Sequence, residues 1–358
     1  MNRLAQRMAR AIEMDGPLSI AAFMTMASHD RKDGFYASRE SIGAHGAFIT
    51  APEISQIFGE LLGLWCVQSW RDQGSPTPAR LVELGPGRGT LIKDALRAAR
   101  IAPDFLAGLE VVLMEASPAF EAVQREQLRD APIAARWVSQ WDQIAGDRPL
   151  FLLANEFLDA LPVRQFVMTE HGWCERMVVV NAASDLAFAL APIPSPLDVP
   201  AERGPAEPGA VYEISPAAQG LVEEASRAIA AYGGAALFID YGHEGSGYGD
   251  TLQAVSRHKQ AGILDAPGKS DLSAHVDFSA LASVASDACA RAYGPIGQGA
   301  FLRALGIDTR GTNLAEHNPG CADGIGAAID RLTGKREMGV LFKAFAILPG
   351  GAPPPPGF

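Results

Sequence analysis

The feature that most constrains the fold is an alternation of short apolar runs with longer amphipathic stretches, which begins at residue 79. We expect the apolar runs to form strands at 80–84, 109–114, 136–138, 150–154, 235–240 and 340–348. Between some of them lie stretches with helical periodicity, at 90–100, 119–129 and 217–232. Such an alternation predicts an α/β fold in which helices cover both faces of a parallel sheet.

The regions around this core have different patterns. Residues 1–78 read as helical, and an apolar helical face over 54–70 follows Thr50 and Glu53, which have capping-box spacing with Pro52 between them. Two runs, 163–168 and 177–180, indicate an appended hairpin that turns at His171-Gly172. We therefore expect a helical region (1–78), a core (79–348) with insertions at about 163–210 and 245–335, and a disordered proline-rich tail (349–358).

Composition excludes several classes of protein. With 48% apolar and 20% charged residues the 358-residue chain has ordinary globular usage, and its net charge of −11 disfavours nucleic acid as a partner. We expect no membrane span, because no apolar run approaches 18 residues. Four widely spaced cysteines favour reduced, buried thiols over a disulfide framework or a metal site. We expect a cytoplasmic location, or a mitochondrial one if the arginine-bearing first helix is a transit peptide.

A glycine-rich loop follows the first predicted strand. The strand ends near Glu83, and Gly85, Gly87 and Gly89 lead directly into a helix, whose N-terminus favours an anionic group. The spacing G-x-G-x-G differs from the G-x-G-x-x-G of NAD-binding turns, and Pro86 has no N–H to offer a diphosphate. The loop therefore suits a small carboxylate, such as the methionine end of S-adenosylmethionine, although a purely structural tight turn is the alternative.

Acidic residues follow the next two strands. Glu115 ends the second strand, where a carboxylate can accept hydrogen bonds from both ribose hydroxyls, or can simply cap a helix. Trp141 and Asp142 follow the third strand, where an aromatic ring or an acid could contact adenine, or where the tryptophan could simply pack. These positions extend the predicted cofactor site from the methionine end toward the nucleoside.

The fourth strand is followed by a cluster of polar residues. Asn155 could bind the cofactor or cap a turn, and Glu156 and Asp159 would share one face if a helical turn followed. Paired carboxylates can hold a guanidinium or divide acid and base roles, and the alternative is a pair of solvated loop acids. Asp240, which ends the fifth strand, either faces the same site or only terminates the strand.

The chain resembles the MidA-type proteins, a family of S-adenosylmethionine-dependent methyltransferases that includes a mitochondrial complex I assembly factor methylating an arginine. The matching segments, in chain order, are residues 48–65, 82–91, 154–166, 239–242, 249–255, 271–278, 298–307 and 338–343. One departure is Ala47, where the family usually has an acid, in Gly46-Ala47-Phe48. A second is Ser41-Ile-Gly43 in place of the usual Pro-Phe-Gly.

The resemblance implies a class I methyltransferase core, Rossmann-like with a seven-stranded sheet, and places Thr50 and Pro52 beside the cofactor. It also implies methyl transfer to an arginine of a partner protein, such as a subunit of a respiratory complex. Glu156 and Asp159 are then the candidate catalytic residues. The alternatives are a non-catalytic assembly chaperone on a methyltransferase scaffold and, with less support from the glycine spacing, a nicotinamide-dependent oxidoreductase.

Overall fold

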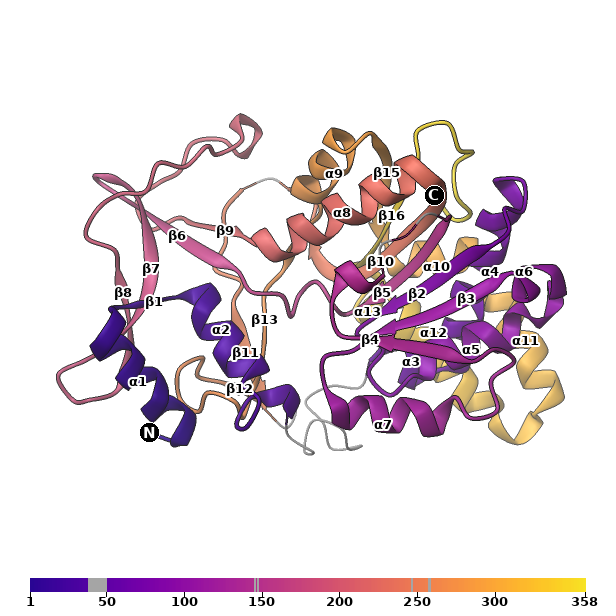
Figure 1. The fold of residues 1–358 in the computed structure, drawn as a ribbon, viewed down its shortest axis with the longest axis horizontal. Helices are drawn as coiled ribbons and strands as arrows, with labels where there is room; N and C mark the ends of the chain where they lie inside the picture. The colour runs from indigo at the N-terminus through magenta and orange to yellow at the C-terminus, as the bar shows by residue number, and fades with distance from the viewer. Residues whose placement is uncertain (38–49, 145, 147, 246, 257–258) are drawn as a thin grey trace. The chain divides into compact units, whose positions relative to one another are not determined.

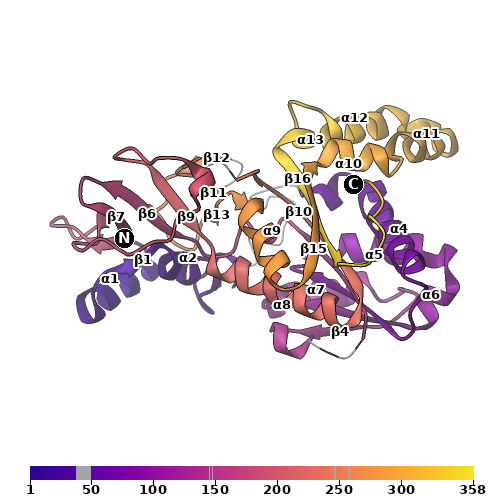
Figure 2. The same cartoon turned by 90° about the horizontal axis from the view of Figure 1, so that it is seen from above.

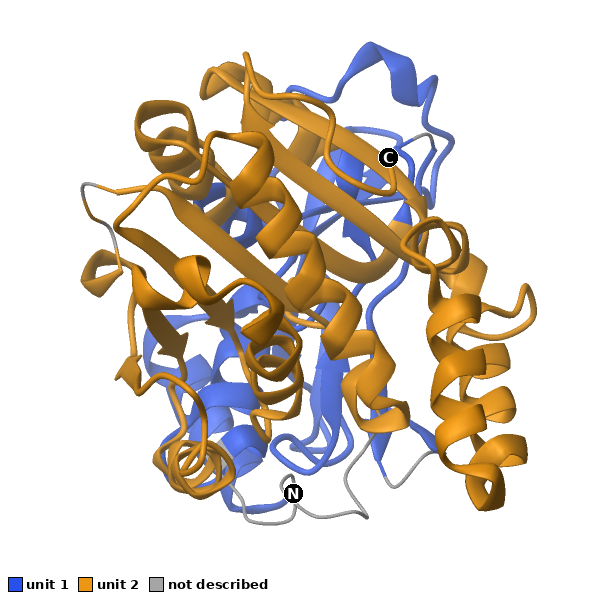
Figure 3. Ribbon diagram, turned by 90° about the vertical axis from the view of Figure 1, so that its right-hand side faces the viewer, with its two compact units in different colours: residues 1–48, 159–220, 243–279 blue, residues 49–158, 221–242, 280–358 orange. Residues whose placement is uncertain are grey.

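The computed structural model describes residues 1–37, 50–144, 146, 148–245, 247–256 and 259–358. The chain forms two compact units, coloured separately in Figure 3. Unit 1 comprises residues 1–48, 159–220 and 243–279, and unit 2 comprises residues 49–158, 221–242 and 280–358. This division differs from the expected boundary at 78, because the N-terminal helices share a core with the segment that we expected to be an insertion into the sheet domain.

Unit 2 is built on a large sheet. Its strands are β2 (Ala79–Leu84), β3 (Leu109–Met114), β4 (Ala135–Val138), β5 (Leu150–Asn155), β10 (Gly234–His243), β15 (Ala290–Gly297) and β16 (Phe342–Pro349). They follow the order β15-β16-β10-β5-β2-β3-β4 (Figure 1). The pairs from β10 to β4 are parallel, whereas β16 is antiparallel to both of its neighbours. The predicted sheet is confirmed as parallel from β10 to β4, with β16 antiparallel, and the six strands expected in it lie within three residues of their predicted ends.

Helices cover both faces of this sheet. They are α3 (Ala51–Ile54), α4 (Gln56–Asp72), α5 (Thr90–Ala98), α6 (Pro103–Ala107), α7 (Pro118–Gln127), α8 (Pro216–Tyr232), α9 (Phe278–Asp287), α10 (Gln298–Ala304), α11 (Ile307–His317), α12 (Ala322–Thr333) and α13 (Met338–Leu341). Figure 2 shows α4 and α5 on one side of the sheet and α8 and α9 on the other. The buried faces pack tightly: Trp65 of α4 and Val222 of α8 are 1% and 0% exposed. Their burial is the main source of stability here.

Unit 1 has its own small core. Its strands are β1 (Leu18–Ser19), β6 (Arg164–Thr169), β7 (Gly172–Val180), β8 (Leu186–Leu190), β9 (Val211–Ile214), β11 (Gln253–Ser256), β12 (Lys259–Ala261), β13 (Asp271–Ser273) and β14 (Val276–Asp277). Helices α1 (Arg3–Asp15) and α2 (Ile20–His29) complete it. Phe23 of α2 and Val178 of β7 share one buried cluster, and β1 pairs with β7. The predicted hairpin β6–β7 is confirmed, with a turn at Glu170-His171.

Three further expectations need correction. The tail is packed rather than disordered: the Trp65 indole N–H donates to the Pro356 carbonyl at 3.1 Å, and the Phe358 ring packs in a tilted arrangement against Phe301 with centroids 5.2 Å apart. Cys66 and Cys174 are buried free thiols as expected, but Cys289 and Cys321 are exposed. The N-terminal part is not purely helical, since it contains β1.

Within the described residues, no helix is both long and apolar enough to cross a membrane.

Candidate functional site

The sheet of unit 2 reverses its strand order between β2 and β5. After β2 the chain adds β3 and β4 on one side, and it then returns to place β5 on the other side of β2. Leu84 at the end of β2 pairs with Ala154 near the end of β5, so the loops that follow both strands start side by side. In open α/β sheets, ligands bind outside the carboxyl ends of strands at such a reversal. This edge carries the glycine loop and Asn155-Glu156.

The glycine loop has three residues with left-handed backbone. Gly85, Gly87 and Gly89 have φ values of +59°, +53° and +80°, which a residue with a side chain adopts only under strain. A β-carbon at Gly87 would meet nothing within 4 Å among the described residues, so the backbone there is open. At Gly85 a β-carbon would lie 2.6 Å from Cδ2 of Phe157. The helix α5 starts directly after Gly89, and its first N–H groups point toward this loop.

Glu83 is a buried acid immediately before the loop. It is 3% exposed, and its Oε2 has no hydrogen-bond partner among the described residues. Burial raises the pKa of Glu83 to about 8; the nearby charge of Glu115 adds to the rise, and the backbone N–H of Ile92 opposes it. A buried carboxyl with an unused oxygen is suited to a cationic ligand group, which would replace the missing partner and favour the ionised form.

Glu115 follows β3, as the sequence predicts. Its Oε1 accepts from the Ser117 N–H at 2.8 Å, and its Oε2 accepts from Nε2 of Gln124 at 2.9 Å. Burial raises the pKa of Glu115, and these two donors, together with the backbone N–H of Ala116, oppose the rise. Because an ionised carboxylate offers about four acceptor positions, Glu115 can still accept bonds from a diol.

Glu156 is held in a strained backbone conformation directly after β5. Its φ is +50°, an uncommon value for a residue other than glycine and one that recurs at functional sites. Its Oε1 accepts two hydrogen bonds of 3.0 Å, one from the Ala51 N–H and one from Nδ2 of Asn155. Asn155 Oδ1 is buried and has no partner among the described residues. The two side chains are therefore oriented together at the end of β5.

The segment around Thr50 meets the site through its backbone. Thr50 precedes α3, but its side chain makes no capping hydrogen bond, so the predicted capping box is wrong in that respect. Ser55 instead caps α4, which begins at Gln56 after a break in the helix. The Glu53 carboxylate accepts from the Thr90 hydroxyl at the start of α5. Pro52 lies in the first turn of α3, next to Ala51, whose N–H donates to Glu156, and next to Glu53, which contacts Thr90.

Two other predicted site residues, Asp159 and Asp142, lie on different segments of the chain. Residues 156–163 form bends and turns, so no helical turn places Asp159 on one face with Glu156, and Asp159 belongs to unit 1. There, burial and the charge of Asp159 raise the pKa of Asp271 to about 7, and the Tyr36 hydroxyl donates to Asp271 at 2.9 Å. Asp142 is exposed in the 3₁₀ turn (Trp141–Gln143) after β4. Ala47 and residues 41–43 lie outside the described residues.

Sequence reasoning missed two residues that shape the loop, Phe157 and Gln124, and left Asp240 undecided. Asp240 Oδ2 accepts from the N–H groups of Phe157 and Leu158, at 3.1 and 2.9 Å, and thereby fixes the loop after β5. The sequence signal that could have indicated this role is the position of Asp240 at the end of a predicted strand. Nothing in the local pattern distinguishes Phe157 from an ordinary apolar loop residue.

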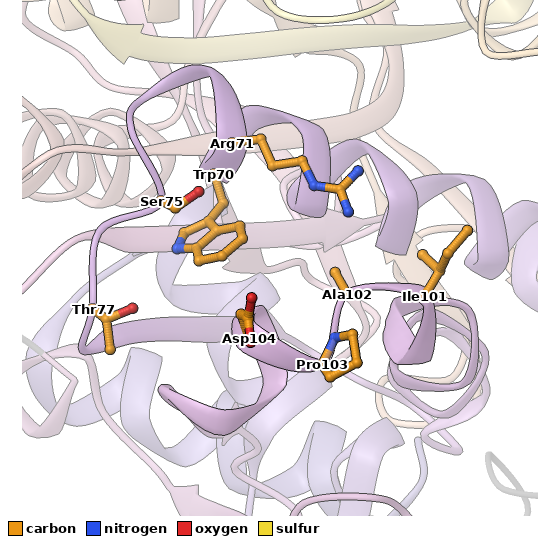
Figure 4. A pocket seen from close by; sticks show the side chains of 8 residues that line it. All are labelled: Trp70, Arg71, Ser75, Thr77, Ile101, Ala102, Pro103 and Asp104. Carbon is orange, nitrogen blue, oxygen red and sulfur yellow. The ribbon is translucent and has the colours of Figure 1, made fainter.

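A separate hollow lies away from these groups. It is lined by Trp70, Arg71, Ser75, Thr77, Ile101, Ala102, Pro103 and Asp104 (Figure 4). Thr77 precedes β2, so this hollow adjoins the amino end of that strand and not its carboxyl end. Neither the glycine loop nor any predicted site residue lines it. We therefore assign the candidate site to the carboxyl end of the sheet.

Comparisons with known proteins agree with this placement. Residues 61–296 match the model of a family of S-adenosyl-L-methionine-dependent methyltransferases. The rat and human proteins named "Protein arginine methyltransferase NDUFAF7, mitochondrial" are 38% and 37% identical, over 94% of this chain and 82% and 81% of their own. A Burkholderia thailandensis protein, crystallised with S-adenosyl-homocysteine, superposes with a TM-score of 0.86 at 28% identity, over 98% of this chain and 93% of that chain. The chain therefore belongs to the MidA-like family of S-adenosyl-L-methionine-dependent methyltransferases.

Proposed function

We propose that this protein transfers a methyl group from S-adenosylmethionine to an arginine guanidinium of a partner protein. The arginine acceptor is supported by the names of the curated relatives, which are protein arginine methyltransferases. The observation that carries the proposal is the oriented carboxylate of Glu156, which lies at the strand reversal beside the glycine loop. A carboxylate in that position suits a cationic, hydrogen-bond-donating acceptor.

The residues present fit the methionine end of this cofactor. The unused Oε2 of buried Glu83 would accept from the α-ammonium group, which would stabilise the ionised form of Glu83. The open backbone at Gly87 and the N-terminus of α5 would receive the carboxylate. Gly85 and Gly89 supply the left-handed turns that shape this cradle.

The nucleoside would lie along the next loops. We propose that Glu115 binds the ribose hydroxyls and that Asn155, through its unpartnered Oδ1, binds the cofactor near the end of β5. Asp142 remains our proposed contact for adenine, and Thr50 and Pro52 remain proposed cofactor neighbours. For Thr50 and Pro52, the contact between Ala51 and Glu156 is the supporting observation.

The bound sulfonium would supply an activated methyl group, so the protein's own contribution is alignment and charge. A guanidinium has no free nitrogen lone pair while it is fully protonated. Glu156 would accept a hydrogen bond from it and draw positive charge away from the attacking nitrogen. As the N–C bond forms and the S–C bond breaks, one N–H proton leaves the guanidinium, and Glu156 would be its first acceptor. The products are methylarginine, S-adenosylhomocysteine and a proton.

Asp159 is our second proposed catalytic residue, and its role needs a separate test because it belongs to unit 1. A subunit of a respiratory complex is the partner that we propose from the family resemblance. The curated relatives are named as mitochondrial proteins, and we keep the cytoplasm as the proposed location of this chain.

Labelling of a proteome tests the function. Extract from cells that lack the gene is incubated with the purified protein and S-adenosylmethionine that carries a deuterated methyl group, and labelled arginines are mapped by mass spectrometry. We expect label on arginine of one or few proteins, and none with Glu156→Gln. Label on another residue type would reject the arginine acceptor. Binding of S-adenosylhomocysteine without any label transfer would favour the non-catalytic assembly chaperone.

A further inference from the structure

One glutamine joins the two halves of the proposed cofactor site. Gln124 lies on α7 and is 0% exposed. Its Nε2 donates to the Gly87 carbonyl at 2.8 Å and to Oε2 of Glu115 at 2.9 Å, and its Oε1 accepts from the Trp137 indole N–H at 2.8 Å. A single buried amide thus links the glycine loop, the acid after β3 and strand β4.

The partners leave the amide only one orientation. The indole N–H can only donate and the Gly87 carbonyl can only accept, so the oxygen must face Trp137 and the nitrogen must face the loop. Both N–H groups of Nε2 are used, one on each cofactor-binding element. The side chain also packs against the start of α5, since a β-carbon at Gly89 would lie 3.5 Å from Cγ of Gln124.

We infer that Gln124 is a positioning residue for the cofactor, an inference that rests on the proposed site. By bonding to both Gly87 and Glu115, it fixes the separation between the groups that would receive the methionine end and the ribose. Its N–H also stabilises the ionised form of Glu115, against the effect of burial. Gln124 would not contact the cofactor itself; it would orient Gly87 and Glu115, which would contact it.

The test compares Gln124→Met, which keeps the volume but removes the donors, with Gln298→Met. Gln298 is a matched control because it is also 0% exposed and its Nε2 donates to a backbone carbonyl, that of Leu332, at 2.8 Å. Both variants should lower Tm. Only Gln124→Met should weaken S-adenosylhomocysteine binding, by at least tenfold in calorimetry, and raise the KM for S-adenosylmethionine in the labelling reaction while kcat stays within threefold.

The outcomes separate this inference from the proposed site. If the native protein binds S-adenosylhomocysteine and Gln124→Met binds it equally well, the positioning role is rejected and the site stands. If the native protein does not bind the ligand, the proposed cofactor site itself fails. Should Gln124→Met not fold, Trp137→Phe removes the indole N–H that orients the amide, keeps an aromatic ring at that position and should weaken binding about threefold; unchanged affinity in that variant would reject the role.

Discussion

The ring of Phe157 packs directly over Gly85, so that a β-carbon at position 85 would lie 2.6 Å from Cδ2 of the ring. The two residues come from loops that follow the adjacent strands β2 and β5. Gly85 therefore lacks a side chain because Phe157 occupies that space, whereas Gly87 has open space beside it. From the sequence, Gly85, Gly87 and Gly89 together form one predicted ligand loop, whereas the structure gives Gly85 and Gly87 different surroundings.

Substitution at Gly85 should act through Phe157. We expect Gly85→Ala to weaken S-adenosylhomocysteine binding at least tenfold, about 1.4 kcal/mol, because the new methyl group displaces the ring and the φ of +59° disfavours alanine. The Tm should fall as well. The double variant Gly85→Ala/Phe157→Ala should recover part of the Tm loss, as read by thermal shift and calorimetry. Strictly additive effects of the two changes would show that the contact is energetically unimportant.

Glu156→Gln should separate binding from turnover. The amide oxygen can still accept from the Ala51 N–H, so we expect cofactor affinity within about threefold of the native value. Loss of the negative charge should reduce methyl transfer at least 100-fold, about 2.7 kcal/mol, because the variant can no longer accept the guanidinium proton. The labelling reaction at saturating cofactor measures this. Asp159→Asn, assayed in parallel, tests the second carboxylate, and native rates for both would remove the acids from the mechanism.

Glu83 should couple ligand binding to proton release. With its pKa raised to about 8, Glu83 is mostly protonated at pH 7 in the free protein. Binding of an ammonium group favours the ionised form, so close to one proton should be released per S-adenosylhomocysteine at pH 7. Calorimetry in buffers of different ionisation enthalpy measures that number. In Glu83→Gln the release should vanish and affinity should fall at least tenfold; release unchanged in the variant would assign the proton to another group.

The raised pKa of Glu83 also predicts how the stability of the folded protein depends on pH. The folded protein keeps the Glu83 proton up to about pH 8, whereas the unfolded chain releases it near the ordinary glutamate pKa of 4.5. Between these values the folded state binds more protons, so the contribution of Glu83 to stability falls as pH rises and is constant above pH 8. The ligand-free Glu83→Gln protein should therefore melt roughly 5 °C higher than the native protein at pH 8. The difference should shrink toward pH 5.

The C-terminal segment should contribute to stability despite its composition. Phe358→Ala removes the ring that packs on Phe301, and we expect a loss of about 1–2 kcal/mol, or roughly 2–6 °C in Tm. Ile101→Ala is a suitable control, because Ile101 is 69% exposed and should change Tm by less than about 1 °C. Equal melting temperatures of Phe358→Ala and the native protein would mean that the tail adds nothing in solution.

Much of the fold was predictable because a buried strand corresponds to a short run of apolar residues in the sequence. Strands such as β2 and β3 are buried nearly throughout, and each ends next to a glycine or an acid that the sequence displays. The reversal between β2 and β5 then brings Gly85 and Asn155 together. The glycine loop, Glu115 and Glu156 were identifiable for that reason.

What escaped prediction depends on contacts between distant segments. A run of prolines has few donors and reads as disordered, yet the carbonyl of Pro356 accepts from Trp65, almost three hundred residues earlier. The spacing of Glu156 and Asp159 suits one face of a helix, but the left-handed backbone at Glu156 starts a turn instead. Gln124 looked like any polar residue on a helix, because its three partners come from three other elements.

The left-handed backbone at Glu156 has a consequence for laboratory evolution. Such a conformation costs a residue with a β-carbon about 1 kcal/mol or more, and glycine or asparagine would relieve most of that cost. A selection for heat resistance alone should therefore recover variants at position 156 that have a higher Tm than the native protein and transfer methyl groups poorly. The protein would in that case be keeping a locally unfavourable residue for the sake of its chemistry.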